Sequence, residues 1–99
     1  MRKISVNAAK ALLSCNKFSG NNTYVLAGDT YAEMYLFGNN IARYDAKSDT
    51  LEVNFRGWFT NTTKDRLNAV LWEYNKTRPF WAGCDYPHNG WIEVPPREK

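Results

Sequence analysis

The sequence predicts one small α+β domain, and three observations lead to this. A chain of 99 residues has the length of a single domain. Aromatic residues make up 15% of the chain, which supplies large side chains for a core and argues against disorder. Helix-like and strand-like patterns occupy separate parts of the chain, which favours α+β over a parallel sheet. We expect residues 1–96 to form the domain and 97–99 a charged tail.

The first predicted helix covers residues 5–15. Ser5 is a suitable N-cap, since its hydroxyl can accept a bond from a backbone N–H of the first turn. Apolar residues between Val6 and Leu13 recur at the spacing of one helix face. Gly20 and the asparagines that follow it end the helical pattern.

Residues 23–56 predict a four-stranded antiparallel meander. β-prone runs follow one another, and turn residues such as Gly, Asn, Asp and Ser separate them. Gly38 and the two asparagines after it predict a tight turn, because Gly and Asn accept positive φ. In the last run, Leu51, Val53 and Phe55 alternate with polar residues, so one face is buried. The predicted strands are residues 23–27, 31–37, 41–46 and 51–56.

A second helix is predicted from the threonines at 60–63 to Asn75. Thr62 and Asp65 resemble a capping box. The apolar residues from Leu67 onward recur at helical spacing and form a stripe that must face the sheet. The predicted core residues are Leu51, Val53, Phe55, Leu67, Val70 and Leu71.

The aromatic segment after Pro79 predicts a short C-terminal hairpin. Its expected strands are residues 80–82 and 91–94, and Asn89 with Gly90 is the turn signal.

Charge and composition exclude several classes of protein. The net charge of +3 is mild, and the basic residues are scattered rather than arranged in the dense runs of nucleic-acid-binding arms. No stretch reaches the roughly 20 apolar residues that span a bilayer, and no apolar region follows the basic N-terminus. We therefore expect a cytoplasmic protein with no membrane partner. The two cysteines, Cys15 and Cys84, are expected to be reduced thiols.

Three stretches resemble a widespread family of small proteins encoded by tailed phages of bacteria. They are residues 8–25, the hairpin YLFGNNIARYD at 35–45, and GWFTNTTKDRLNAVL at 57–71. The family shows a Gly-Asn turn followed by Ile-Ala, and a Gly-Trp-x-Thr-x-Thr-Thr-x-x-Arg-Leu-Asn segment, which is the most specific of the three. The resemblance implies a phage accessory protein that acts inside the infected cell, and it supplies no catalytic residue.

The start of the second helix is the first candidate site. A helix N-terminus presents unpaired N–H groups and partial positive charge, which suits an anion. The alternative is that the threonines only cap the helix, that Trp58 fills the core, and that the basic residues are solvated. The candidate residues here are Trp58, Thr60, Thr62, Lys64 and Arg66.

The aromatic C-terminal segment is the second candidate site. Exposed aromatic side chains beside a guanidinium can stack on bases or anchor a protein interface. The alternative is that they form core and lid. The candidate residues here are Arg78, Trp81, Tyr86 and Trp91.

Reactive groups are sparse in the sequence. His88 is the only histidine, so a zinc site with Cys15 and Cys84 has unlike spacings and one ligand too few. A nucleophile pair of Cys84 and His88 is an equally weak pattern. Acid pairs such as Asp45 and Asp49 flank turns, as solvated hairpins normally do. We therefore expect no enzyme, no cofactor and no metal.

These observations favour a non-catalytic accessory protein that binds and modulates a host or phage protein. The alternative is a small nucleic-acid-binding module that uses residues 60–66 and the C-terminal aromatics. Ten acidic residues dilute any basic face, so nucleic-acid binding is expected to be weak, about 10⁻⁴ to 10⁻⁶ M at physiological salt.

Overall fold

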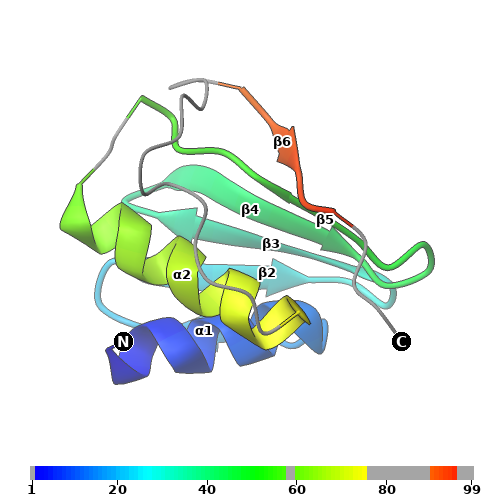
Figure 1. Ribbon diagram of the computed structural model, residues 1–99. Coiled ribbons are helices and arrows are strands. Elements are labelled where there is room, and N and C mark those ends of the chain that lie inside the picture. The colour runs from blue at the N-terminus through cyan, green and yellow to red at the C-terminus, as the bar shows by residue number, and fades with distance from the viewer. Residues whose placement is uncertain (1, 58–59, 76–89, 96–99) are drawn as a thin grey trace.

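The computed structural model describes residues 2–57, 60–75 and 90–95 and shows an α+β fold of two layers (Figure 1). Helices α1 (Lys3–Leu13) and α2 (Asn61–Asn75) form one layer. The other layer is a six-stranded antiparallel sheet whose strands lie side by side in the order of the sequence. The strands are β1 (Phe18–Ser19), β2 (Thr23–Ala27), β3 (Tyr31–Leu36), β4 (Asn39–Asp45), β5 (Thr50–Val53) and β6 (Ile92–Glu93).

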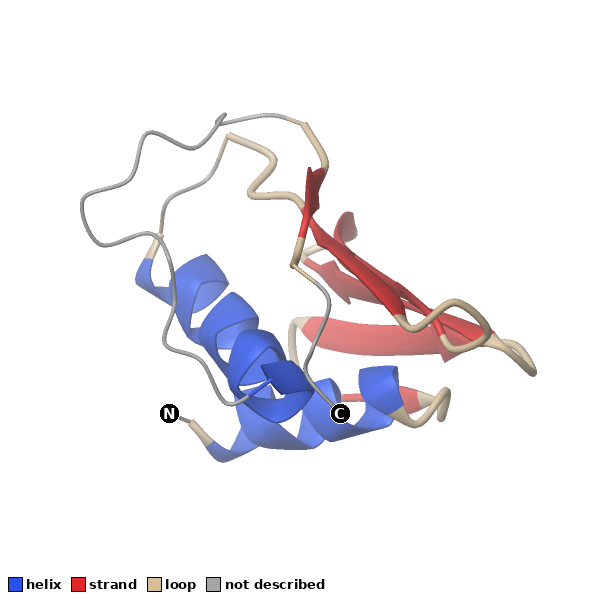
Figure 2. Cartoon of the chain, turned by 45° about the vertical axis from the view of Figure 1, so that its right-hand side comes forward, coloured by secondary structure: helices blue, strands red, loops and turns tan. Residues whose placement is uncertain are grey.

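Both helices lie on the same face of the sheet and pack against each other (Figure 2). The core fills the space between the two layers, and the six core residues predicted from the sequence are all buried there. From α1 it takes Ala8, Ala9 and Leu12, which share one helix face because they are one and four residues apart. In the part of the chain that the structure describes, no helix has both the length and the apolar character to cross a bilayer.

The start of α1 differs from the prediction. The helix begins at Lys3, so Ser5 lies within its first turn and is not the N-cap. The side chain of Ser5 is fully buried, and its hydroxyl donates a hydrogen bond to the carboxylate of Asp65 in α2. A serine near a helix start suits a cap and an interhelical contact equally well, and only the packing of α2 decides between them.

The start of α2 is capped by Thr60. Its Oγ1 accepts a hydrogen bond from the backbone N–H of Thr63 at 3.1 Å, which satisfies one of the open donors of the first turn. The predicted capping box of Thr62 and Asp65 does not form, because Asp65 instead accepts bonds from Ser5 and from the backbone N–H of Arg2.

The β3–β4 turn lies one position earlier than predicted. Phe37 and Gly38 form it, with φ of 50° and 81°, and the predicted turn residues Asn39 and Asn40 belong to β4. Two central residues with positive φ match the right-handed twist of a hairpin. A bulge follows, because Met34 pairs with Ala42 while the next residue pairs with Asn40.

In the described residues, the structure has one strand that the sequence did not predict. This is β1, which is only two residues long and too short to give a periodic signal. Strand β6 lies within the predicted strand at residues 91–94. Residues 80–82, expected to pair with 91–94, lie outside the described residues. Strand β6 pairs with β5 instead, where Ile92 lies opposite Val53. The α+β class and the four predicted strands β2 to β5 are confirmed, whereas the meander has five consecutive strands, β1 to β5, rather than four.

Candidate functional site

The sheet face that points away from the helices carries aromatic and charged side chains, and we call it the open face. Side chains alternate along a strand. In β3, Ala32 and Met34 are buried, whereas Glu33 and Tyr35 point to the other side. No described element covers this second face (Figure 2). The open face comprises Tyr24, Leu26, Tyr31, Glu33, Tyr35, Arg43, Glu52 and Trp91.

Two tyrosines form a stacked pair on the open face. Tyr24 and Tyr35 are partners in the β2–β3 ladder, and their ring centroids lie 4.9 Å apart with planes 8° from parallel. Burial, followed by the nearby Glu33 and Tyr24, raises the pKa of the Tyr35 phenol, and Arg56 partly offsets this. Nearby, 48% of Leu26 and 54% of Tyr31 are exposed, so this face presents apolar area to solvent.

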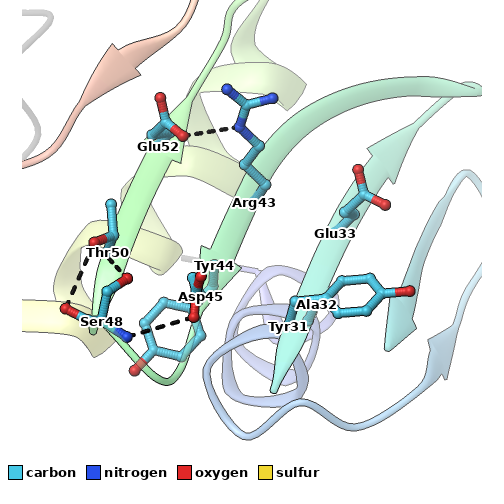
Figure 3. A pocket seen from close by; sticks show the side chains of 9 residues that line it. All are labelled: Tyr31, Ala32, Glu33, Arg43, Tyr44, Asp45, Ser48, Thr50 and Glu52. Atoms are coloured by element: carbon cyan, nitrogen blue, oxygen red, sulfur yellow. Dashed lines mark hydrogen bonds and ion pairs between the residues drawn. The ribbon is translucent and has the colours of Figure 1, made fainter. Parts of the chain in front are cut away.

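Arg43 connects three strands on the same face. Its Nε donates to Oε1 of Glu52 on β5 at 2.9 Å (Figure 3). The guanidinium carbon also lies 3.9 Å from the ring centroid of Trp91, just before β6, and that of Arg56 lies 5.4 Å from the same centroid. Both distances are within the range of cation–π attraction. The indole is therefore held by two cations.

A hollow of about 450 Å³ lies beside Arg43, over β3, β4 and β5 (Figure 3). Three acids, Glu33, Asp45 and Glu52, and one arginine line it among the described residues. Asp45 also accepts the backbone N–H of Lys47 at 2.9 Å, as an Asp at the start of a turn commonly does. The hollow has an excess of negative charge and suits a cationic group better than a phosphate.

A second pocket, of about 490 Å³, lies at the β3–β4 hairpin tip against the start of α2, and we call it the tip pocket. Its apolar wall includes Phe37, which is 71% exposed. The threonines of the first turn of α2 and Arg56 supply its polar groups. Its described lining residues are Leu36, Phe37, Asn39, Ile41, Phe55, Arg56, Thr60, Thr62 and Thr63.

Arg66 lies inside the protein and connects the two helices to the sheet. Its side chain is 2% exposed, and Nε donates to Oγ1 of Thr23 at 2.8 Å. The terminal nitrogens donate to Ser5 Oγ at 2.7 Å and to Asn22 Oδ1 at 3.2 Å. Burial lowers the pKa of the Arg66 guanidinium, and the nearby Asp65 carboxylate opposes this. This network explains why a buried arginine directly precedes the apolar stripe of α2.

The predicted site residues are placed in five different ways. Thr60 and Thr62 line the tip pocket, and Trp91 lies on the open face. Lys64 lies in the first turn of α2, where its backbone N–H donates to Thr60. The structure corrects the expectation that Arg66 lies at the surface, because its donors are used internally. Trp58, Arg78, Trp81 and Tyr86 lie outside the described residues.

The sequence analysis missed the tyrosines and arginines of the open face. The signal was present in β3, where Tyr31, Glu33 and Tyr35 alternate with small or apolar residues. Alternation alone does not show which face the helices cover, so these tyrosines could have been core. Arg43 and Arg56 had no sequence signal, since the groups that they contact lie in β4, in β5 and in the loop before β6.

Groups that hold metals do not gather in residues 2–57, 60–75 and 90–95, where no three His, Cys, Asp or Glu side chains are close enough. Cys15 has a free thiol, whose pKa is raised by burial and then by Asp45. Cys84 and His88 lie outside the described residues.

Comparison with known proteins identifies a phage family. The family model of the Kyanoviridae Gp96 protein matches residues 1–82, so the chain belongs to this family of phage proteins. No curated protein and no solved structure matches the chain.

Proposed function

We propose that this member of the Kyanoviridae Gp96 family is a non-catalytic accessory protein that binds and modulates a host or phage protein through its open face. The observation that supports this is a sheet face that none of the described elements covers, on which Tyr24, Tyr35 and Trp91 are arranged with Arg43. Aromatic residues and arginine are the types most enriched where proteins bind one another.

The charges on the open face favour a protein partner over a nucleic acid. Glu33, Asp45 and Glu52 lie around Arg43, and Glu93 of β6 lies opposite Glu52 of β5 in the strand ladder. Most of the affinity of a nucleic-acid binder comes from neutralising phosphates, which these acids oppose. The partner should therefore present basic side chains together with an apolar patch that covers Leu26 and Tyr31.

The polar groups of the open face already bind one another, which supports recognition rather than catalysis. Glu52 is paired with Arg43, and Glu33 accepts a hydrogen bond from Nδ2 of Asn40 at 2.8 Å. A general acid or base instead needs a carboxyl group that is free to exchange a proton with a substrate.

The test is a comparison of tagged variants as baits in phage-infected cells. Arg43→Glu should abolish capture of the partner, because it places a carboxylate beside Glu52 and removes the cation from the Trp91 ring, which disrupts the arrangement of side chains on the face. Lys10→Glu makes the same charge change on an exposed residue of α1 and should leave capture unchanged. Circular dichroism establishes that both variants are folded.

The outcomes separate the proposed function from its alternative. A protein captured by the unmodified chain and by Lys10→Glu, lost with Arg43→Glu, and retained after nuclease treatment supports the proposal. Capture that disappears with nuclease favours the nucleic-acid-binding module. Capture that both variants retain equally would place the binding surface elsewhere.

A further inference from the structure

The tip of the β3–β4 hairpin has a phenylalanine at a turn position where the backbone conformation disfavours bulky residues. Phe37 has a φ of 50°, a left-handed conformation that bulky L residues rarely adopt. Asn or Asp commonly precedes Gly in such two-residue turns. Phe37 is also 71% exposed, so burial does not compensate for the conformation. Strained backbone of this kind is concentrated at functional sites of proteins.

Phe37 forms one wall of the tip pocket. Leu36 and Ile41 from the two strands of the hairpin and Phe55 from the segment after β5 provide the other apolar lining. These three residues are 4%, 2% and 1% exposed, so they belong to the core, and only a small part of each borders the pocket. The volume of about 490 Å³ is within the range of small-molecule sites, roughly 300–1,000 Å³.

Arg56 gives the tip pocket its charge. It is the one charged side chain among the nine described lining residues, and none of them is acidic. Its Nε donates to the carbonyl of Asn40 at 2.9 Å, and its backbone N–H donates to Oδ1 of Asn54, which is 1% exposed. The bond from Nε orients the guanidinium, which has four further N–H donors on its terminal nitrogens.

We propose that the tip pocket binds a small organic acid with an apolar body. The carboxylate of this ligand pairs with Arg56, the fork geometry of which suits a planar anion. The apolar body lies against Phe37, Ile41 and Phe55. The Thr60 hydroxyl caps Thr63, so the assignment rests on Arg56 and the apolar wall rather than on the helix end.

The tip pocket differs from the open face in the charge of its lining, although the guanidinium of Arg56 also lies 5.4 Å from the Trp91 ring of the open face. The hollow beside Arg43 is lined by three acids, whereas the described lining of the tip pocket contains none. Arg43→Glu on the open face and Phe37→Gly in the tip pocket therefore test the two sites separately, and failure of one proposal leaves the other standing.

The first experiment measures octanoate binding by calorimetry at neutral pH, with octylammonium of the same chain length as the opposite charge. We expect saturable binding of octanoate with a dissociation constant of about 1 mM or tighter, and no binding of octylammonium. Arg56→Gln should weaken octanoate binding by about tenfold or more, since a charge-assisted hydrogen bond is lost. Lys10→Gln removes the same charge from α1 and should have no effect.

Phe37→Gly is the second variant, and it separates loss of the pocket wall from misfolding as the cause of weaker octanoate binding. Glycine adopts positive φ without strain, so this variant should fold at least as well. It should nevertheless weaken octanoate binding several-fold, because it removes an apolar wall. Amide shifts in NMR spectra should occur at residues 36–41, 55–56 and 60–63.

Several results would overturn the proposal. These are equal affinity in Arg56→Gln and the unmodified chain, binding of octylammonium as tight as octanoate, or amide shifts centred on the open face. A peptide ending in a free leucine carboxylate that binds more than about tenfold tighter than octanoate, while its amide does not, would reassign the pocket to a protein chain end.

Discussion

Two arginines on opposite faces of the sheet show how position decides what a side chain does. Arg66 comes from the helix layer, is 2% exposed, and donates to Ser5, Asn22 and Thr23. The side chain of Arg43, on the open face, is 43% exposed and contacts Glu52 and Trp91. The first connects elements far apart in the sequence, and the second remains accessible to a partner. The covered face should therefore control stability, and the open face should control recognition.

Replacing Arg66 should give the largest effect on stability. Arg66→Met leaves the hydroxyls of Ser5 and Thr23 and the Asp65 carboxylate without their charged donor. We expect the free energy of unfolding to fall by about 4 kcal/mol, as when one partner of a buried ionic contact is removed. Urea denaturation measures this, with Lys64→Met as a control in the same helix. A loss below about 1 kcal/mol would mean that the network is not a main stabilising contact.

A pair of leucines tests the two faces directly. Leu51 of β5 is fully buried under the helices, whereas Leu26 of β2 is 48% exposed on the open face. Leu51→Ala should lower the free energy of unfolding by about 3 kcal/mol, because it leaves a cavity. Leu26→Ala should change it by no more than about 0.5 kcal/mol. Similar losses in both variants would show that the open face is covered in solution.

The tyrosine stack should make a smaller contribution. In a double-mutant cycle with Tyr24→Ala and Tyr35→Ala, we expect a coupling energy of about 0.5–1 kcal/mol. Thermal or urea unfolding of the four proteins measures it. A coupling near zero would mean that the two rings do not remain stacked in solution.

The smallest expected effect concerns pH. The raised pKa of Tyr35 means that its phenolate is less favourable in the folded chain than in the unfolded chain. Its contribution to stability is present below the unfolded value of about 10 and is lost as the pH rises through the folded value. Tyr35→Phe should remove this part of the alkaline loss, measured by urea unfolding between neutral and alkaline pH. An unchanged pH profile in Tyr35→Phe would assign the loss to other groups.

Much of the fold could be predicted from the sequence, because its elements have local signals. Helical spacing, alternation and turn signals predicted both helices, strands β2 to β5, the position of β6 and the six core residues. Strand β1 could not be predicted, since only its pairing with β2 defines it, and the pairing of β6 with β5 could not be predicted because the two strands are far apart in the sequence.

The site was less predictable because it depends on contacts across the fold. Thr60 and Thr62 could be singled out as polar groups at a helix start. That Arg66 turns inward follows from Asn22 and Ser5, about 44 and 61 residues away in the chain. The open face required knowledge of which side the helices cover.

The order of the strands has a consequence for how the chain folds. From β1 to β5 each strand pairs with the next one in the sequence, so the meander closes through short loops. The contacts of Arg66 with α1 and β2 instead join distant segments. We expect φ-values to be high in the β3–β4 hairpin and low at Arg66. During synthesis, α1 and the first five strands can therefore come together before α2 has left the ribosome, and the part of the core that α2 covers stays exposed to solvent until then.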